Sequence, residues 1–303
     1  MLERLRQVAF MVKDLEDAKD LYRRYLGMET CHSEGPNQYG LQRAVLPAGN
    51  GTFIELLQPT TAEATSRYLE KRGEAPYMLT FETRQYDKLI LNLKSLDVQF
   101  AEENIAGQYR HAYIFPESAN GALLEVVEVT SKDNPWPAAG PDWRNLEHQP
   151  LTKQLRQMAV LVRDLDQALA RWEAMFGITA TKRFHVSFTD LEIAVLPLSG
   201  KDTFIELAQP TGGDVPSARF LERYGEGIYL TIFEIEDSLA MDEHLKEQEA
   251  RYTSSRVTSN YVNLGFNSIW LHPAGMKGAF TQLSQVLVED NPWPPAGETW
   301  HLE

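Results

Sequence analysis

Apolar runs and amphipathic stretches alternate along the first half of the chain in an order that predicts defined elements. A β-type run over residues 7–12 leads to Asp14, a helix N-cap residue followed by acids, and Gly27 gives the stop signal of the helix that begins there. The apolar positions of this helix recur at the spacing of one helical face, namely Ala18, Leu21, Tyr22 and Tyr25. The pattern therefore predicts a strand that runs into a helix.

Three further β-type runs follow, separated by Gly, Pro and Asn turn residues. They cover residues 28–31, 41–46 and 52–57 and complete a βαβββ module. A second module is predicted from a strand over residues 77–82, a helix over 87–96, and strands near 111–115 and 123–129.

The same motifs return in the same order in the second half of the chain. Residues 5–15 are repeated at 155–165, residues 52–56 at 203–207, and the Asp-Asn-Pro-Trp-Pro motif of residues 133–137 at 290–294. The distance between copies grows slightly along the chain, which places small insertions in loops. We therefore predict two domains, residues 1–149 and 150–303, each with two βαβββ modules and an Asn-Pro-Trp-Pro tail.

The tail of each half combines prolines with tryptophans. Proline fixes an extended path, and tryptophan buries a large apolar area. We expect these tryptophans to hold each tail against its own half as a structural clasp rather than to form a binding motif.

Composition narrows the classes of function. The 303 residues include 43 Asp and Glu against 29 Lys and Arg, and the resulting charge of -14 argues against nucleic acid and anionic membrane surfaces as partners. The single cysteine, Cys31, excludes an internal disulfide. No apolar run approaches the roughly 20 residues of a membrane helix, and no signal peptide is evident, so we expect a cytoplasmic protein.

The motifs resemble those of the vicinal oxygen chelate superfamily, of the glyoxalase/bleomycin-resistance/dioxygenase type, and within it most of all the methylmalonyl-CoA epimerase branch. The resemblance rests on a strand followed by Lys-Asp-Leu, a helix ending in Tyr-Leu-Gly at residues 25–27, and the motifs at residues 53–59 and 68–73. It implies an α+β fold in which tandem βαβββ modules, four in all, form two open curved-sheet barrels around small-molecule cavities. It also implies a divalent metal bound by four strand residues in each barrel.

The metal-ligand positions of the family carry unusual residues in this chain. The resemblance places them on Gln7, Glu55, Met78 and Glu125 in the first half and on Gln157, Glu206, Leu230 and Gln282 in the second. Because no histidine stands at any of them, the set argues against a transition metal. Gln7, Glu55 and Glu125 offer three oxygens to a weakly bound Mg, Mn or Ca ion, and the alternative is that no metal binds.

The same positions allow chemistry without a metal. Two neighbouring buried carboxylates raise the pKa of one of them and can act as acid and base, so we predict Glu55 and Glu125 as catalytic residues. The predicted substrate-binding residues are Gln7, Met78, His111, Gln157, Glu206 and Gln282. A buried glutamine that only satisfies a polar neighbour is the alternative for Gln7, although Val8, Phe10 and Val12 should point to the opposite face.

Three functions remain open at this point. The first is an isomerase, epimerase or lyase that transfers a proton next to a carbonyl, and the second is a metal-free sequestration protein of bleomycin-resistance type. An extradiol-type dioxygenase is the third, and the missing histidines count against it. We expect the first half to carry any chemistry because it keeps both glutamates, and the second half to be a scaffold or a second pocket. The expected partner is a small molecule, and the duplication supplies the equivalent of a dimer while leaving a further homodimer open.

Overall fold

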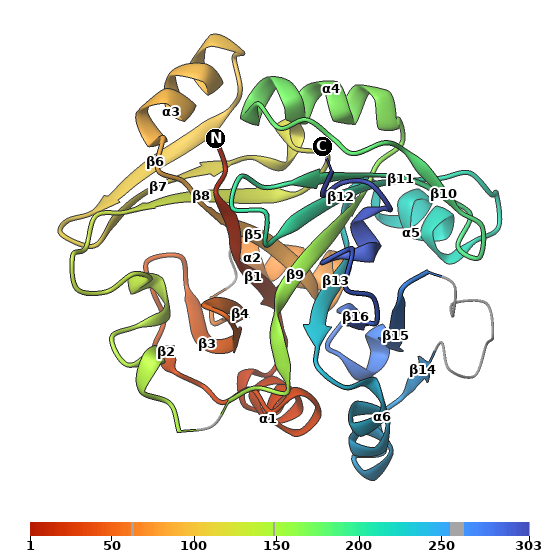
Figure 1. Ribbon diagram of the computed structural model, residues 1–303. Helices are drawn as coiled ribbons and strands as arrows, with labels where there is room; N and C mark the ends of the chain where they lie inside the picture. The colour runs from red at the N-terminus through yellow and green to blue at the C-terminus, as the bar shows by residue number, and fades with distance from the viewer. Residues whose placement is uncertain (62–63, 148, 255–263, 303) are drawn as a thin grey trace.

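Each half of the chain builds its own curved sheet. The computed structural model describes residues 1–61, 64–147, 149–254 and 264–302, and Figure 1 shows the two sheets side by side, the first in red to yellow and the second in green to blue. The first sheet has eight strands in the order β2-β3-β4-β1-β5-β8-β7-β6, and the second repeats it as β10-β11-β12-β9-β13-β16-β15-β14. The predicted α+β fold of four βαβββ modules is confirmed.

The elements of the two halves correspond one to one. In the first half they are β1 Arg4–Met11, α1 Leu15–Leu26, β2 His32–Glu34, β3 Leu41–Gly49, β4 Thr52–Pro59, α2 Ala64–Arg72, β5 Ala75–Glu82, α3 Tyr86–Ser95, β6 Phe100–Ile105, β7 Tyr109–Ile114 and β8 Leu123–Val129. In the second half they are β9 Thr152–Leu161, α4 Leu165–Phe176, β10 Phe184–Val186, β11 Leu191–Pro197, β12 Phe204–Pro210, α5 Pro216–Tyr224, β13 Gly227–Ile235, α6 Ser238–Glu247, β14 Tyr252–Ser254, β15 Phe266–Leu271 and β16 Phe280–Val286.

The structure corrects the predicted elements at the edges of the first sheet. The strand expected over residues 28–31 is wrong, because β2 begins at His32, and the backbone bonds to β3 only from Cys31 onward. The sequence pattern also does not predict β6 or α2. Strand β6 is the last of its sheet and leaves most of its side chains exposed, so it lacks the apolar alternation that marks a strand.

Helix α1 forms where the sequence predicts it. The carboxylate of Asp14 accepts a hydrogen bond from the backbone N–H of Asp17 at 2.9 Å, and Gly27 ends the helix in the left-handed conformation with a φ of 64°. The four predicted apolar positions are buried. Helices α1 and α4 contain 12 residues each, and no helix in the described part of the chain is long and apolar enough to cross a membrane.

The pleat of β1 separates a core face from an inner face. Val8, Phe10 and Val12 pack into the large core cluster, as predicted, whereas Ala9 and Met11 belong to a separate apolar cluster on the inner face of the sheet. Since side chains alternate along a strand, Gln7 lies on the inner face with Ala9 and Met11.

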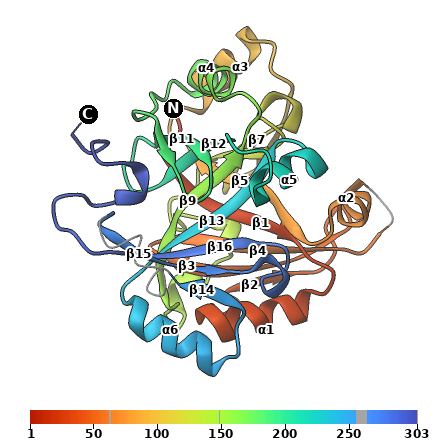
Figure 2. The same cartoon turned by 90° about the vertical axis from the view of Figure 1, so that its right-hand side faces the viewer.

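The two halves are related like the subunits of a symmetric dimer. The backbone N–H of Leu5 donates to Thr203 Oγ1 at 2.8 Å, and the equivalent N–H of Leu155 donates to Thr52 Oγ1 at 2.8 Å. Helices also pair across the halves: α3 lies beside α4, and α6 lies beside α1 (Figures 1 and 2). Such reciprocal contacts are typical of an isologous interface, which here lies within one chain.

Candidate active site

The candidate site lies on the inner face of the first sheet. In the parallel pair β1 and β4, Ala9 is opposite Glu55, and in the parallel pair β5 and β8, Thr80 is opposite Glu125. The two modules thus use the same register, which makes Glu55 equivalent to Glu125 and Gln7 equivalent to Met78. The structure therefore brings the four positions that the resemblance implies onto one face of one sheet.

A chain of hydrogen bonds fixes the orientation of Gln7. The indole Nε1 of Trp136 donates to Gln7 Oε1 at 3.3 Å, and Gln7 Nε2 donates to Glu55 Oε2 at 2.9 Å. Because an indole N–H can only donate, it determines that the amide oxygen faces Trp136 and the amide nitrogen faces Glu55. All three side chains are buried. The predicted clasp is confirmed for Trp136, which packs into its own half, and it also positions a site residue.

The guanidinium of Arg43 lies against Glu55. Arg43 Nε is 3.1 Å from Glu55 Oε1, and Arg43 Nη2 donates to the backbone oxygen of Ala138. Burial raises the pKa of Glu55, Arg43 and Gln7 oppose this shift, and the charge of Glu125 adds to it, so that the pKa lies above its ordinary value. The strand register places both carboxylates on the inner face of the same sheet.

Two donors orient the carboxylate of Glu125. Thr80 Oγ1 donates to Glu125 Oε2 at 2.8 Å, and His111 Nδ1 donates to Glu125 Oε1 at 2.6 Å. The imidazole is 3% exposed, and its Nε2 lies 3.4 Å from Glu103 Oε2 without the geometry of a hydrogen bond. His111 is thus placed beside the predicted catalytic carboxylate, with one ring nitrogen not hydrogen-bonded within the described residues.

Glu103 connects this site to the opposite edge of the sheet. It accepts hydrogen bonds from the hydroxyl of Tyr39 and, at 3.2 Å, from Gln38 Nε2, both in the connection between β2 and β3. Since β2 and β6 are the two edge strands, these bonds join the edges of the curved sheet. The carboxylate of Glu103 therefore joins the two edges of the sheet and also lies next to the imidazole of His111.

Tyrosine hydroxyls add neutral donors to the same face. The rings of Tyr109 and Tyr113 contact the His111 ring edge-on, with centroids 5.2 and 4.9 Å away. Burial raises the pKa of Tyr109 to about 12, and burial with the nearby charges of Glu125, Glu55 and Glu103 raises that of Tyr113 further. Both phenols therefore stay protonated at neutral pH and keep their O–H donors.

The second half repeats the chain of hydrogen bonds that links tryptophan, glutamine and glutamate in the first half. Trp293 Nε1 donates to Gln157 Oε1 at 2.8 Å, and Gln157 Nε2 donates to Glu206 Oε2 at 2.7 Å. Burial raises the pKa of Glu206 to about 7, and the hydrogen bond from Gln157 opposes that shift. The register that places Arg43 near Glu55 places Ile193 near Glu206. The second carboxyl therefore has no cationic neighbour at this position.

The other module of the second half has lost its charges. Gln282 stands in place of Glu125, and its Nε2 donates to Ser268 and Ser284 at 3.0 and 2.9 Å. Its Oε1 accepts from the indole of Trp270 at 3.1 Å. Ser268 occupies the position of His111 in the strand register, so neither the carboxylate nor the imidazole of the first half is present. Leu230, the fourth position, lies on β13.

Sequence reasoning did not identify Arg43, Thr80 or Glu103 as parts of the site. Arg43 carried a usable signal, because it shares the inner face of β3 with Leu41 and Val45, where a charge is unexpected. Thr80 and Glu103 carried none, since Thr80 meets Glu125 through the pairing of β5 with β8, and Glu103 meets His111 through the pairing of β6 with β7. The predicted residues Gln7, Glu55, Met78, Glu125 and His111 do lie on one face.

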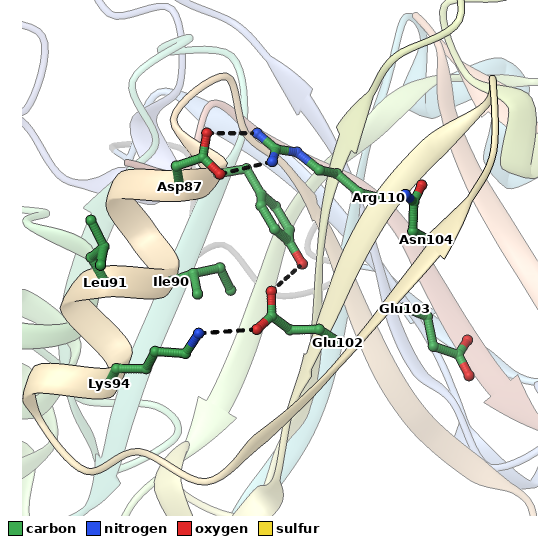
Figure 3. A pocket seen from close by; sticks show the side chains of 9 residues that line it. Asp87, Ile90, Leu91, Lys94, Glu102, Glu103, Asn104 and Arg110 are labelled. Atoms are coloured by element: carbon green, nitrogen blue, oxygen red, sulfur yellow. Dashed lines mark hydrogen bonds and ion pairs between the residues drawn. The ribbon is translucent and has the colours of Figure 1, made fainter.

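A surface groove of about 570 Å³ between α3 and β6 is a separate feature (Figure 3). Its charged side chains neutralise one another: Asp87 pairs with Arg110 at 2.7 Å, and Lys94 pairs with Glu102 at 3.3 Å. Glu103 also lines the groove, but its carboxylate points away from α3 (Figure 3) and accepts the hydrogen bond from Tyr39. The groove therefore offers paired surface charges rather than a convergent site.

The donor set of the first half does not fit the divalent metal that the resemblance implies. The oxygen of Gln7, its only ligating atom, accepts from Trp136, and its amide nitrogen faces Glu55. Arg43 brings a positive charge to Glu55, and both oxygens of Glu125 accept hydrogen bonds. Within the described residues, no group of three or more His, Cys, Asp or Glu side chains is arranged to hold a metal. A cation at this site would compete with Trp136 for the oxygen of Gln7 and would be repelled by the guanidinium of Arg43.

Comparison with known proteins gives relatives of two kinds. The ethylmalonyl-CoA/methylmalonyl-CoA epimerase of Cereibacter sphaeroides is 32% identical over 134 residues, 44% of this chain and 98% of the relative. The mitochondrial methylmalonyl-CoA epimerase of Bos taurus is 26% identical over 167 residues, 54% of this chain and 87% of the relative. Among solved structures, a mutant 4-hydroxymandelate synthase from Streptomyces coelicolor matches 97% of this chain and 95% of its own with a TM-score of 0.75; at 14% identity this likeness shows the fold alone.

The family itself is defined by a match in both halves. The model described as the Glyoxalase/Bleomycin resistance protein/Dioxygenase superfamily matches residues 6–115 and again residues 156–265. The first range contains Gln7 of β1 and Glu55 of β4. The second contains the equivalent residues Gln157 of β9 and Glu206 of β12. The resemblance inferred from the motifs is confirmed: the chain is a tandem duplication that belongs to the glyoxalase/bleomycin resistance protein/dioxygenase superfamily.

Proposed function

We propose that the first half is a metal-independent enzyme that transfers a proton next to a substrate carbonyl, in an isomerisation, epimerisation or lyase reaction. The observation that carries the proposal is the pair of buried carboxylates, Glu55 and Glu125, that lie on the inner face of the same sheet with different partners. Carboxyl groups in unlike environments are the usual basis for separate acid and base roles. Two epimerases among the relatives support a reaction of this class.

The partners of each carboxyl suggest its role. We assign Glu125 as the base that removes the proton beside the carbonyl, because Thr80 and His111 hold its carboxylate in place. Glu55 is the acid that returns a proton, since its pKa is raised by burial and by Glu125. Arg43 would stabilise the negative charge that develops on the carbonyl oxygen. After each turnover Glu125 holds the proton that it removed and Glu55 has lost the proton that it delivered, so exchange with solvent water restores the starting state of both carboxyl groups.

The proposal is tested by exchange of the substrate proton. Methylmalonyl-CoA and other carbonyl compounds with an acidic C–H bond are incubated with the protein in D₂O, and deuterium incorporation is followed by NMR. Glu125→Gln and Glu55→Gln should each lower the exchange rate by about 10²- to 10⁴-fold, the usual contribution of acid–base catalysis. Glu102→Gln, which changes a carboxylate of the surface groove, is the matched control and should leave the rate unchanged. Rates that stay equal in all three variants would contradict the assignment.

Metal independence needs its own measurement. Exchange should persist after treatment with EDTA, and elemental analysis should find no stoichiometric transition metal. Activity that is lost on chelation and restored by Mg, Mn or Ca would reverse the argument from the donor set. The dioxygenase alternative would show as substrate-dependent oxygen consumption that requires iron.

Sequestration without turnover is the second candidate. It is favoured by the hydrogen bond from Trp136 to Gln7 and by the equivalent bond from Trp293 to Gln157. In each half this bond occupies the amide oxygen at the family's first ligand position. A ligand that binds and is recovered unchanged, with no deuterium incorporated, would support this function. In either case we propose a small-molecule partner and a cytoplasmic location, no role for nucleic acid or membrane, and a homodimer as an open possibility.

A further inference from the structure

The second half contains a buried carboxyl that has no counterion. Glu206 is 6% exposed, and its Oε2 accepts the hydrogen bond from Gln157. Within the described residues, its other oxygen, Oε1, accepts no hydrogen bond, and Glu206 takes part in no salt bridge. Oε1 is not among the fully buried side-chain atoms that lack a partner in the described residues, so it keeps accessible surface and can accept a hydrogen bond from a ligand.

Comparison of the two halves shows what Glu206 has lost. In the first half Arg43 lies 3.1 Å from the equivalent carboxylate, whereas the second half has Ile193 in the same register. The neighbouring inner-face position changes from Leu57 to Ala208. Both replacements shorten the side chain, so the space that the guanidinium fills in the first half is left to smaller apolar groups in the second.

Most of the described residues that surround Glu206 are apolar. Among the described residues, the polar groups of this face are Gln157 of β9, Gln282 and Ser284 of β16, Ser268 and Trp270 of β15, and Tyr229 of β13. Tyr229 is the titratable group of this set, and burial raises its pKa to about 12. The remaining neighbours form one apolar cluster drawn from β9, β11, β12, β13 and the C-terminal tail, which includes Leu161, Ile193, Val195, Phe204, Ala208, Ile232 and Trp293. Burial in this cluster raises the pKa of the carboxyl to about 7, so both protonation states are populated near neutrality.

We propose that the inner face of the second sheet binds an organic monocation, a protonated amine with an apolar body, whose ammonium group pairs with Glu206 Oε1. The ammonium group takes the place that the guanidinium of Arg43 has in the first half, and the apolar cluster contacts the body of the ligand. The site is independent of the proton-transfer chemistry assigned to the first half. It gives the second half a binding role of its own rather than that of a scaffold.

The proposal is tested with benzylamine as the probe and with benzyl alcohol and benzoate as matched controls of the same shape. Isothermal titration of the full chain should show saturable binding of benzylamine, at least tenfold weaker binding of benzyl alcohol, and no binding of benzoate. Glu206→Gln, which is nearly isosteric, should weaken benzylamine binding at least tenfold. Absence of benzylamine binding, or equal affinity for the amine and the alcohol, would overturn the proposal.

Proton release gives a second readout. At pH 7 about half of Glu206 carries a proton that an ammonium ligand must displace, so the binding heat should depend on the ionisation enthalpy of the buffer. This dependence should disappear at pH 9, where the carboxyl is ionised before binding, and it should be absent in Glu206→Gln. A buffer dependence that is unchanged in the variant would assign the proton to another group and contradict the role of Glu206.

A substitution at residue 193 tests the comparison between the halves. Ile193→Arg supplies the internal cation of the first half and should abolish benzylamine binding, whereas Ile193→Met, of similar length but uncharged, should retain it within about threefold. Circular dichroism verifies that each variant is folded. If Ile193→Arg does not fold, Glu206→Gln decides the question by itself. Full binding by a folded Ile193→Arg protein would overturn the proposal.

Discussion

At the scale of single residues, one indole N–H decides how a predicted ligand residue can act. The indole nitrogen of Trp136 donates a hydrogen bond and accepts none, so its bond to the oxygen of Gln7 leaves the amide nitrogen to face Glu55. Alternation with Val8, Phe10 and Val12 predicts the face of Gln7, and the family resemblance places Glu55 with it. It does not predict the partner of Gln7, because Trp136 lies 129 positions away and its contact depends on the path of the tail.

Removal of the indole N–H of Trp136 should affect both the free energy of unfolding and the orientation of the Gln7 amide, and the two effects can be measured separately. Trp136→Phe should lower the free energy of unfolding by about 2–4 kcal/mol, from the lost hydrogen bond and the smaller buried ring. It should also alter the pH profile of proton exchange, since the amide of Gln7 is then free to turn its oxygen toward Glu55. Urea unfolding and rate measurements across pH test both effects. Trp143→Phe, which loses a bond to Asn134 instead, should change stability but leave the pH profile as it is.

The buried carboxyl of Glu206 should make stability depend on pH. Its pKa of about 7 in the folded state exceeds the value of about 4.5 in the unfolded chain, so its protonated form contributes fully below pH 4.5 and this contribution is lost as the pH rises through 7. The free energy of unfolding of the wild type should therefore fall between pH 5 and pH 8.5 by roughly 2–3 kcal/mol more than that of Glu206→Gln, which lacks the titrating group. Urea unfolding at the two pH values measures this change. A difference between variant and wild type that is the same at both would contradict it.

At the scale of elements, prediction succeeded where local chemistry is strong and failed at the edges of the sheet. The N-cap Asp14, the stop at Gly27 and the apolar face between them are local signals, and α1 follows them closely. Strand β6 depends on pairing with β7 and has few buried side chains, and β2 has only three residues. These short or exposed strands owe their existence to the strand beside them, which a periodicity argument does not see.

The helix caps offer a test with an internal replicate. Asp14→Ala removes the acceptor for the N–H of Asp17, and Asp164→Ala removes the equivalent acceptor for Gln167. Each should lower the free energy of unfolding by about 1 kcal/mol, the typical worth of an N-cap. Because the caps lie in different halves, the double variant should show the sum of the two effects in denaturant unfolding. Asp142→Ala, at a position with no side-chain cap bond, should change stability by less than about 0.5 kcal/mol.

At the scale of the whole molecule, the repeat predicts two related halves but not how they join. The large core cluster contains Val8 and Phe10 of β1 together with Met158 and Val160 of β9, so the apolar interior continues across the halves. This joint core could not be predicted from either repeat alone, because each helix and strand shows only that it has an apolar face and not which element covers it. The symmetry that results leaves the two inner faces apart, which allows one to keep charged groups and the other to become apolar.

The reciprocal threonine bonds allow a test of whether the halves unfold together. Thr52→Val and Thr203→Val each leave a buried backbone N–H without its acceptor, that of Leu155 or Leu5, and each should cost about 1–3 kcal/mol. Since the core is shared, either substitution should shift a single unfolding transition that tryptophan fluorescence and far-ultraviolet circular dichroism report together. Thr211→Val, whose hydroxyl bond lies in an exposed turn, should shift it by less than about 0.5 kcal/mol. Two separate transitions, with only the substituted half moving, would show that the halves fold as independent units joined by a weak interface.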